Sequence, residues 1–289
     1  MKTARPQPFA REAARRPGRL DDVPFVAFDT ETTGLRVSDR LVELAAVSFR
    51  GEEVEGEWSA LVDPGVPIPA EATAVHGIRD EDVRGRPSAA QALVSFLGFI
   101  EGAALVAHNA PFDVRVLSLE LLRAGMSLPD NPTLDTCAIP RRLRLDVPNH
   151  RLGTLARAFG VRQAGAHRAL TDARVACDLL RAYLRELGEP AEALIRYSLT
   201  QDSALLSFRR FASEPVPDSP LTALFRRARA EGRSVSMVYR GGSHGMAPRR
   251  VTPRDLYSWG GTVYLEADCR EDGVLKTFRL DRIAGARLD

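Results

Sequence analysis

The first two thirds of the chain alternate short apolar runs with amphipathic stretches. Strands are predicted where apolar or alternating residues lie between turn residues, at 24–29, 40–50, 53–62 and 103–108. Helices are predicted where apolar residues recur every three or four positions, at 88–101, 111–124, 152–159 and 168–187. Strands that alternate with helices in this way are typical of a layered α/β domain.

The pattern changes after a less regular helical stretch at 189–211 and a proline-rich segment at 213–220. One helix follows, and then short strands separated by glycine-rich turns. The helix is predicted at 220–231 and the strands at 235–240, 249–252, 262–268 and 274–280. We therefore divide the chain into a flexible basic tail at 1–21, an α/β domain at 22–188, a helical and proline-rich linker at 189–220 and a small β-rich domain at 221–289.

The composition is that of a globular protein, with 44% hydrophobic and 27% charged residues, which excludes a disordered or fibrous chain. No apolar run approaches the roughly 20 residues that cross a bilayer, so we expect no membrane association. Three scattered cysteines, and no apolar segment behind the basic N-terminus, favour a cytoplasmic setting. The net charge is +5 over residues 221–289 and −8 over 21–220, so the C-terminal part either attracts polyanions or is a solvated basic surface.

Two carboxylates, Asp29 and Glu31, end the first predicted strand, where side chains two residues apart point to the same face. Held together, they repel each other unless a cation neutralises them, and a hard divalent cation suits their oxygen ligands. Asp113 and Asp172 lie in the first turns of two predicted helices, and His167 precedes the second helix. Taken singly, each has an ordinary explanation, such as a solvated pair at a strand end or an acid that stabilises a helix dipole.

Taken together, these residues resemble the DEDDh, or DnaQ-like, 3′–5′ exonucleases. The resemblance covers about residues 23–187 and is strongest to the proofreading exonuclease of bacterial DNA polymerase III. It implies an α/β, ribonuclease H-like fold with a mixed sheet flanked by helices. The matching segments are FVAFDTETTGL at 25–35, VHGI at 75–78, HNAPFDVRVL at 108–117, NHRLGTLA at 149–156 and HRALTDA at 167–173.

The resemblance also implies hydrolysis of phosphodiester bonds with two Mg²⁺ or Mn²⁺ ions, which stabilise the attacking and leaving oxygens. His167 would take the proton from the attacking water, a role that histidine fills well near neutral pH. The residues that would hold the metal are Asp29, Glu31, Asp113 and Asp172.

The terminal nucleotide would be bound by five residues: Thr32, Thr33, His76, Asn109 and Phe112. For Phe112 the alternative is simple packing, and for His76 it is capping of the turn at Gly77.

Residues 221–289 resemble the WYL domain, a small SH3-like or Sm-like β fold. The resemblance rests on RRVTPRDL at 249–256, GTVYL at 261–265 and TFRLDRI at 277–283, although Val263 stands where the family has tryptophan. It implies that this module senses nucleic acid or nucleotides, and the alternative is a structural or dimerising domain. The candidate ligand-binding residues are Arg249, Arg250, Tyr264, Arg279 and Arg282.

We therefore expect an exonuclease that removes nucleoside monophosphates from single-stranded 3′ ends of nucleic acid, with DNA as the expected substrate. A DNA polymerase or repair complex is the candidate protein partner. One alternative is an exoribonuclease of the same family. The other is a WYL-type nucleic-acid-binding regulator in which the nuclease fold mainly binds ends. The intact set of four acids and one histidine favours the enzyme.

Overall fold

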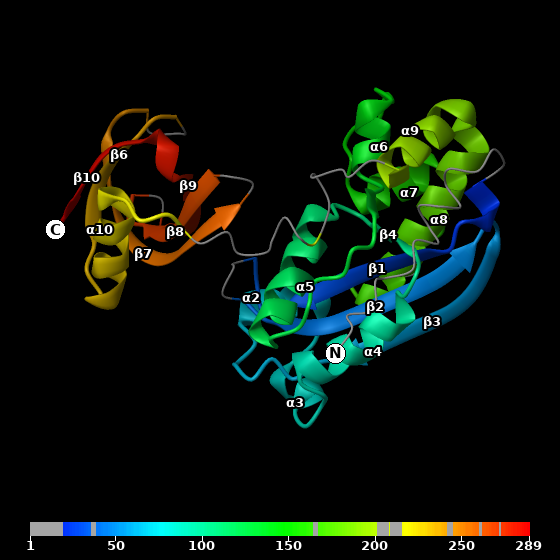
Figure 1. The fold of residues 1–289 in the computed structure, drawn as a ribbon, viewed down its shortest axis with the longest axis horizontal. Coiled ribbons are helices and arrows are strands. Elements are labelled where there is room, and N and C mark those ends of the chain that lie inside the picture. The colour runs from blue at the N-terminus through cyan, green and yellow to red at the C-terminus, as the bar shows by residue number, and fades with distance from the viewer. Residues whose placement is uncertain are drawn as a thin grey trace, which may run out of the picture. The chain divides into compact units, whose positions relative to one another are not determined.

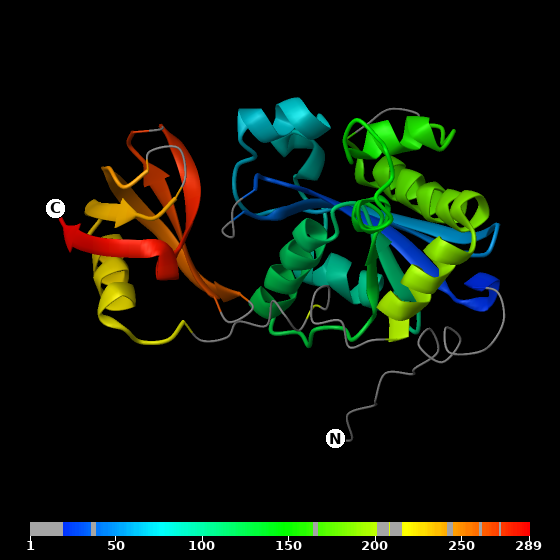
Figure 2. The ribbon, with the colours of Figure 1, turned by 90° about the horizontal axis from the view of Figure 1, so that it is seen from above.

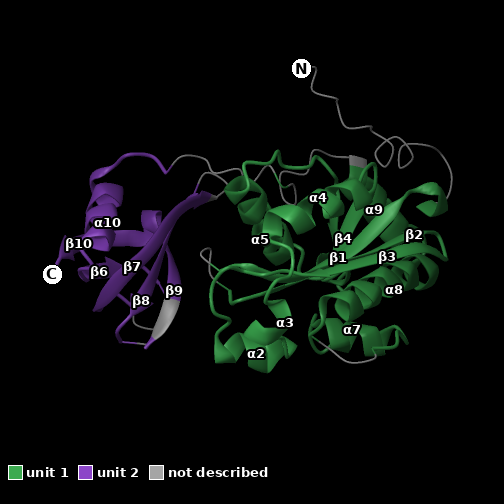
Figure 3. Cartoon of the chain, turned by 90° about the horizontal axis from the view of Figure 1, so that it is seen from below, with its two compact units in different colours: residues 1–35, 39–209 green, residues 36–38, 210–289 purple. Residues whose placement is uncertain are grey.

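The protein is described here from a computed structural model that covers residues 20–35, 39–163, 167–200, 208, 216–241, 245–259, 262–271 and 273–289. Its described residues form two compact units, one within 1–35 and 39–209 and the other within 210–289 (Figure 3). Each unit has its own sheet and its own hydrophobic core, so each is described separately.

The first unit is built on a five-stranded mixed sheet with the order β3-β2-β1-β4-β5 (Figure 1). Strand β2 is antiparallel to β1 and β3, whereas β4 and β5 are parallel to β1 and to each other. Strands β2 and β3 form a hairpin, because Arg50 pairs with Glu53 across a two-residue turn. The strands are β1 Phe25–Thr32, β2 Leu41–Arg50, β3 Glu53–Leu61, β4 Ala104–Ala107 and β5 Thr133–Asp135.

Helices cover both faces of this sheet (Figures 1 and 2). Phe25 and Ala27 of β1 share a core with α8, Ala169–Leu187. Phe28 instead packs against Phe96 of α4, Ala89–Phe99, at a ring separation of 5.9 Å. Because side chains alternate along a strand, the odd-numbered positions of β1 face α8 and the even-numbered ones face the other side. This alternation decides where the carboxylates of β1 lie.

Several shorter elements were not predicted, because they are too short for a clear apolar period. They are α2 Ala70–His76, α3 Asp80–Val83, α6 Ala138–Arg142 and strand β5. The predicted helices at 111–124 and 152–159 are present as α5 Pro111–Arg123 and α7 Leu152–Ala158.

Two segments expected outside the α/β domain pack onto its core. Leu20, expected in the flexible tail, is buried in the turn η1 Leu20–Asp22. Helix α9, Glu189–Thr200, was assigned to the linker, yet Ala191, Ile195 and Leu199 are fully buried against the first unit. The rest of the predicted helix at 189–211, apart from Phe208, and the first part of the proline-rich segment lie outside the described residues.

The second unit is a five-stranded antiparallel sheet of order β10-β6-β7-β8-β9, with helix α10 packed on β7. Phe225 of α10 shares a core with Val251 and Leu265 of the sheet. The β-rich character predicted for this part is confirmed. Its elements are α10 Pro220–Ala230, β6 Val235–Tyr239, β7 Pro248–Trp259, β8 Thr262–Cys269, β9 Val274–Arg279, η3 Leu280–Arg282 and β10 Ile283–Leu288.

The prediction for this sheet was wrong in two places. The strand expected at 249–252 continues to Trp259, because a register shift between Pro253 and Asp255 lets the chain pass the proline. Strand β10 was missed, and its register shifts between Ile283 and Gly285. Within the part of the chain that the structure describes, no helix is long and apolar enough to span a membrane.

Candidate functional site

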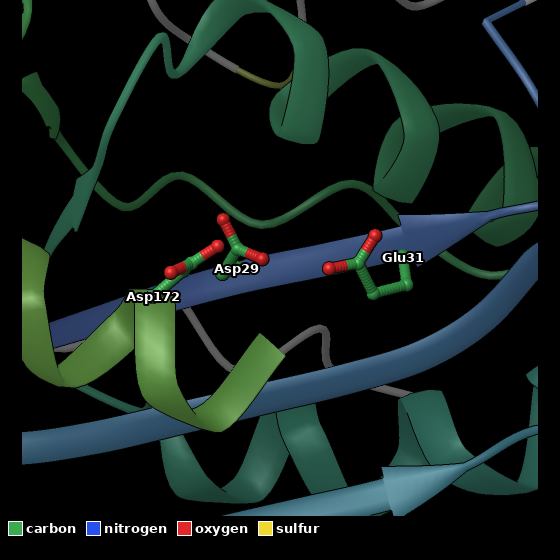
Figure 4. A group of neighbouring side chains, drawn as sticks. All are labelled: Asp29, Glu31 and Asp172. Atoms are coloured by element: carbon green, nitrogen blue, oxygen red, sulfur yellow. The ribbon is translucent and has the colours of Figure 1, made fainter. Parts of the chain in front are cut away.

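Three carboxylates converge where β1 meets the start of α8. Asp29 and Glu31 lie on the α8 face of β1, and Asp172 lies in the first turn of α8. One oxygen from each of the three lies within 4.8 Å of the others. Figure 4 shows Asp29 between the other two side chains. Strand alternation therefore brings together the pair that the sequence predicted, and the helix adds a third acid.

Asp113 is held beside this cluster by Thr30, which lies between Asp29 and Glu31 on β1. It is buried in the first turn of α5, and its Oδ1 accepts hydrogen bonds from the backbone N–H of Thr30 at 3.0 Å and from the Thr30 hydroxyl at 2.6 Å. After burial itself, the charge of Asp113 is the strongest cause that raises the pKa of Asp29. Asp113 therefore adds negative potential to the cluster while its own oxygen is tied to β1.

The start of α8 is fixed by a residue that the sequence reasoning missed. Glu43 on β2 pairs in register with Glu31, and its carboxylate is buried. It accepts hydrogen bonds from Nε and Nη2 of Arg168, at 3.1 and 2.7 Å, and from the backbone N–H of Ala169 at 3.0 Å. The signal for it was present, because Glu43 is the one charged residue in the apolar run LVELAAV.

His167 precedes α8 in a left-handed backbone conformation, with φ at 60°. Its backbone N–H donates to Oδ2 of Asp172 at 3.1 Å, and the residue is exposed. Oδ1 of Asp172 is buried and has no hydrogen-bond partner among the described residues. One oxygen of Asp172 thus orients the chain before the helix, and the other is available to bind a cation. A hydrogen bond from the Gln163 side chain also lowers the pKa of Asp172, against the effect of burial.

Burial raises the pKa of all four acids. The pKa of Asp29 lies well above its ordinary value, that of Glu31 rises to about 8 and that of Asp113 to about 7. The pKa of Asp172 is also raised by burial, against the hydrogen bond from His167. Four ionised carboxylates are therefore unfavourable here without a cation. Converging oxygen ligands and the unpartnered Oδ1 of Asp172 fit a hard divalent ion such as Mg²⁺ or Mn²⁺.

Three residues predicted to bind a nucleotide are buried near the cluster. Thr32 donates its hydroxyl to the carbonyl of Gly34, and Thr33 Oγ1 accepts from the backbone N–H of Arg40. His76 lies close enough to Glu43 for that charge to act on its pKa, but burial dominates and lowers the pKa of His76.

The ring of His76 accepts a hydrogen bond through Nδ1 from the N–H of Ile78, which is the capping contact considered as its alternative role. The backbone of Thr32 lies near enough to the ring to raise the pKa of His76, although burial has the larger effect.

The other two predicted nucleotide contacts lie at the junction of β4 and α5. Asn109 is exposed in a left-handed conformation with φ at 62°. Phe112 is half-buried, with the guanidinium of Arg115 5.4 Å from its ring centroid. Their role in binding stays a prediction.

The candidate residues of the second unit lie on three strands and in η3. Arg249 and Arg250 are neighbours on β7, whereas Tyr264 of β8 pairs in register with Arg279 of β9. Arg279 also binds Asp281 through two hydrogen bonds, and Arg282 is exposed in η3. Their role in binding a ligand stays a prediction.

The fold and the acidic cluster together define a nuclease of the DEDDh type. The sequence matches the family described as Exonuclease over residues 26–180, which is more than half of the chain, and the WYL domain over residues 220–288. The protein therefore belongs to the exonuclease family and carries a C-terminal WYL domain. Both resemblances drawn from the motifs are confirmed.

Two curated relatives illustrate the similarity. A DNA polymerase III subunit epsilon-like protein of Rhodobacter capsulatus is 41% identical over 194 residues, which are 65% of this chain and 26% of the relative. A PolC-type DNA polymerase III of Caldanaerobacter subterraneus is 36% identical over 166 residues, which are 57% of this chain and 12% of the relative. The chain thus spans 26% and 12% of the length of these two relatives.

Solved structures support the fold. Escherichia coli exonuclease I in complex with a dA16 oligonucleotide matches with a TM-score of 0.54 and 18% identity, over 85% of this chain and 55% of that one. Exonuclease I of Methylocaldum szegediense matches with a TM-score of 0.54 and 18% identity, over 91% of this chain and 64% of that one.

The metal-free protein should lose stability as its buried carboxylates ionise. The pKa of Glu31 is about 8 in the folded chain against an ordinary 4.5. Because the folded-state pKa is the higher one, the contribution of Glu31 to stability is present below about pH 4.5 and is lost as the pH rises through about 8. In a chelator, Glu31→Gln should therefore be more stable than the parent, by a margin in thermal midpoint that grows between those pH values.

The control variant is Glu57→Gln, which should change stability in the opposite direction. The hydrogen bond from Arg174 lowers the pKa of Glu57, so that removing this carboxylate should reduce stability at neutral pH. The difference in thermal midpoint between Glu31→Gln and the parent is expected to change with pH. A constant difference would contradict the conclusion that burial raises the pKa of Glu31.

Glu43→Gln should lower kcat and leave KM nearly unchanged. The substitution keeps the shape of the side chain but removes the charge that holds Arg168 and the N–H of Ala169. Small displacements of catalytic groups cost up to roughly 10²-fold in rate, and Asp172 and His167 both depend on this end of α8. Steady-state kinetics with thermal midpoints measured in parallel would separate displacement from unfolding.

The matched control is again Glu57→Gln. The Glu57–Arg174 pair also joins the sheet to α8, but it is exposed and lies further along the helix. Its loss should leave kcat unchanged, and equal losses of kcat in both variants would argue against a positioning role for Glu43.

Proposed function

We propose that this protein is a 3′–5′ exonuclease that releases nucleoside monophosphates from single-stranded DNA with the help of divalent cations. The observation that carries the proposal is the convergence of Asp29, Glu31 and Asp172, with one buried carboxylate oxygen left without a partner among the described residues. The relatives named as DNA polymerase III proteins support DNA as the substrate.

Each acidic residue has a distinct task in this proposal. Asp29, Glu31 and Asp172 would hold the cations, and Asp113, at the start of α5, would bind them directly or through water. When bound, Mg²⁺ or Mn²⁺ neutralises the carboxylates and stabilises the charge that develops on the phosphate oxygens. Without such neutralisation, the cluster would repel the polyanionic substrate.

His167 accepts the proton of the attacking water on an imidazole nitrogen. Its exposed side chain lies next to the cluster because its backbone N–H is bound to Asp172. The imidazole is near enough for its charge to lower the pKa of Asp172. This position suits a general base that acts beside the cations rather than as one of their ligands.

The terminal nucleotide binds near the end of β1. Thr32 and Thr33 follow Glu31 directly, His76 lies close to Glu43, and Phe112 offers a half-buried ring. We propose that the second unit, with its excess of basic residues, holds more of the nucleic acid. A DNA polymerase or repair complex is the partner class that the names of the relatives suggest.

Single-stranded DNA and RNA, each labelled at the 5′ or the 3′ end, test the reaction directly. We expect a 5′ label to give a shortening ladder and a 3′ label to be released at once as a mononucleotide, with Mg²⁺ or Mn²⁺ and not with a chelator. Asp172→Asn should abolish turnover, whereas Asp178→Asn removes the same charge from α8 outside the cluster and should not.

Other outcomes would overturn the proposal. Retained activity of Asp172→Asn would exclude the metal assignment, and release from the 5′ end would exclude the polarity. Preferred cleavage of RNA would favour an exoribonuclease, and tight binding of ends without cleavage would favour a regulator.

His167→Ala should slow turnover by roughly 10²–10⁴-fold, the usual contribution of a general base. Binding of Mn²⁺ should persist, because His167 is not assigned as a ligand. The acidic limb of the pH–rate profile should change in the variant, since it reports the essential base. Wild-type rates across the pH range would leave His167 only a structural role.

A further inference from the structure

The turn between β4 and α5 holds Asn109 in a backbone conformation that few residues adopt. Its φ is 62°, in the left-handed region, which is costly for most residues other than glycine and is tolerated best by asparagine and aspartate. The side chain is exposed, and its amide forms no hydrogen bond within the described part of the chain. Asp113 follows in the first turn of α5. The turn therefore presents a donor and an acceptor near the acidic cluster.

Asp135, at the end of β5, fixes this conformation. Its Oδ1 accepts hydrogen bonds from the backbone N–H of Asn109 and from that of Cys137, both at 2.9 Å. Strands β4 and β5 are parallel, with Ala107 in register with Asp135, so the carboxylate reaches from the end of one strand to the turn after the other. The charge of Asp135 also raises the pKa of Asp113, which places the two carboxyl groups near each other.

The residue before Asn109 is also held in place. Nε2 of His108 donates to the carbonyl of His150 at 3.0 Å, so that in the neutral ring Nδ1 accepts from the hydroxyl of Thr136 at 2.9 Å. These partners lie before α7 and after β5. Because both His108 and Asn109 are bound to neighbouring segments, the turn cannot easily relax, and the left-handed conformation is maintained.

The same arrangement occurs a second time at the site. His167 is left-handed, and its backbone N–H donates to the carboxylate of Asp172. Among the residues described, Arg144 is the remaining left-handed one that is not glycine, and its N–H donates to the nearby carbonyl of Arg141 instead. Backbone strain that surrounding structure maintains is frequent at functional positions. The side chain of His167 has a proposed task, and the parallel indicates one for the amide of Asn109.

We propose that Asp135 is a positioning residue for recognition of the terminal nucleotide, and that it acts through the side-chain amide of Asn109. The inference rests on the proposed binding of that nucleotide near the end of β1. A contact of this kind stabilises the bound substrate and the transition state alike, so its loss raises KM and leaves kcat nearly unchanged. This separates Asp135 from Glu43, whose loss is expected to lower kcat.

Steady-state kinetics on single-stranded DNA and calorimetric titration with thymidine 5′-monophosphate in Mn²⁺ test this role. Asp135→Ala should raise KM and the dissociation constant of the nucleotide, each roughly fivefold, the usual worth of one hydrogen bond. Asp135→Asn keeps an oxygen that accepts both N–H groups, so it should bind like the parent. If Asp135→Ala does not fold, as judged by its thermal midpoint, Asp135→Glu takes its place, because the longer side chain displaces the acceptor.

A second pair of variants tests whether Asp135 acts through Asn109. Asn109→Gly tolerates the left-handed backbone but lacks the amide, so it should weaken nucleotide binding at least as much as Asp135→Ala. The double variant of Asp135→Ala and Asn109→Gly should bind no more weakly than Asn109→Gly alone, since the group that Asp135 positions is already absent.

Asp63→Ala is the matched control. Asp63 follows β3 at the opposite edge of the sheet, and its carboxylate accepts the N–H of Gly65 at 2.9 Å, the same local bond that Asp135 forms with Cys137. Its loss should change neither KM nor nucleotide affinity.

Four outcomes would overturn the inference: no nucleotide binding by the parent, unchanged affinity in Asp135→Ala, additive losses in the double variant, or an equal loss in Asp63→Ala. A parent chain that binds the nucleotide, with the expected effects of the variants, but does not hydrolyse DNA would overturn only the proposed function.

Discussion

Repulsion among buried carboxylates is the constraint on which the first unit depends. Strand alternation points Asp29 and Glu31 to the face that α8 covers, so the fold places like charges where water screens them only in part. Burial raises the pKa of each, and a third acid from α8 adds to the cost. Such an arrangement is stable when a bound cation offsets the repulsion between the carboxylates. Carboxyl groups with pKa values raised in this way are typical of functional sites, and they lie at this end of β1.

Two sets of hydrogen bonds hold the acidic residues in position without the help of a cation. Thr30 supplies one, because its backbone N–H and hydroxyl fix Asp113 at the start of α5. Glu43 supplies the other, because it binds Arg168 and the N–H of Ala169 at the start of α8. Both helices are therefore anchored at the first turn that carries an acid. Displacement of either turn would change the distances between the carboxylate oxygens of the cluster. It would change the packing of the hydrophobic core less.

The sequence predicted the main strands, the long helices and the acidic set, because apolar periodicity and the DEDDh motifs are strong signals. It did not predict α2 or β5, which are too short to show a period, nor β7 beyond Pro253, where a bulge lets a strand pass a proline. Glu43 was missed because its importance depends on the register with Glu31, which the sequence alone does not give. The five basic and aromatic candidates of the second unit were chosen by motif, and the sequence did not show that Arg249 would be buried against the rings of Tyr239 and Phe278.

The two units present opposite forms of one physical problem. The first brings half-buried and buried carboxylates together, and the second buries the guanidinium of Arg249 without a hydrogen-bond partner for Nε and Nη2 among the described residues. In each case the protein's own groups leave the charge incompletely compensated, and a ligand of opposite sign lowers the free energy of the folded state. For the first unit, the ligand that we propose is a divalent cation.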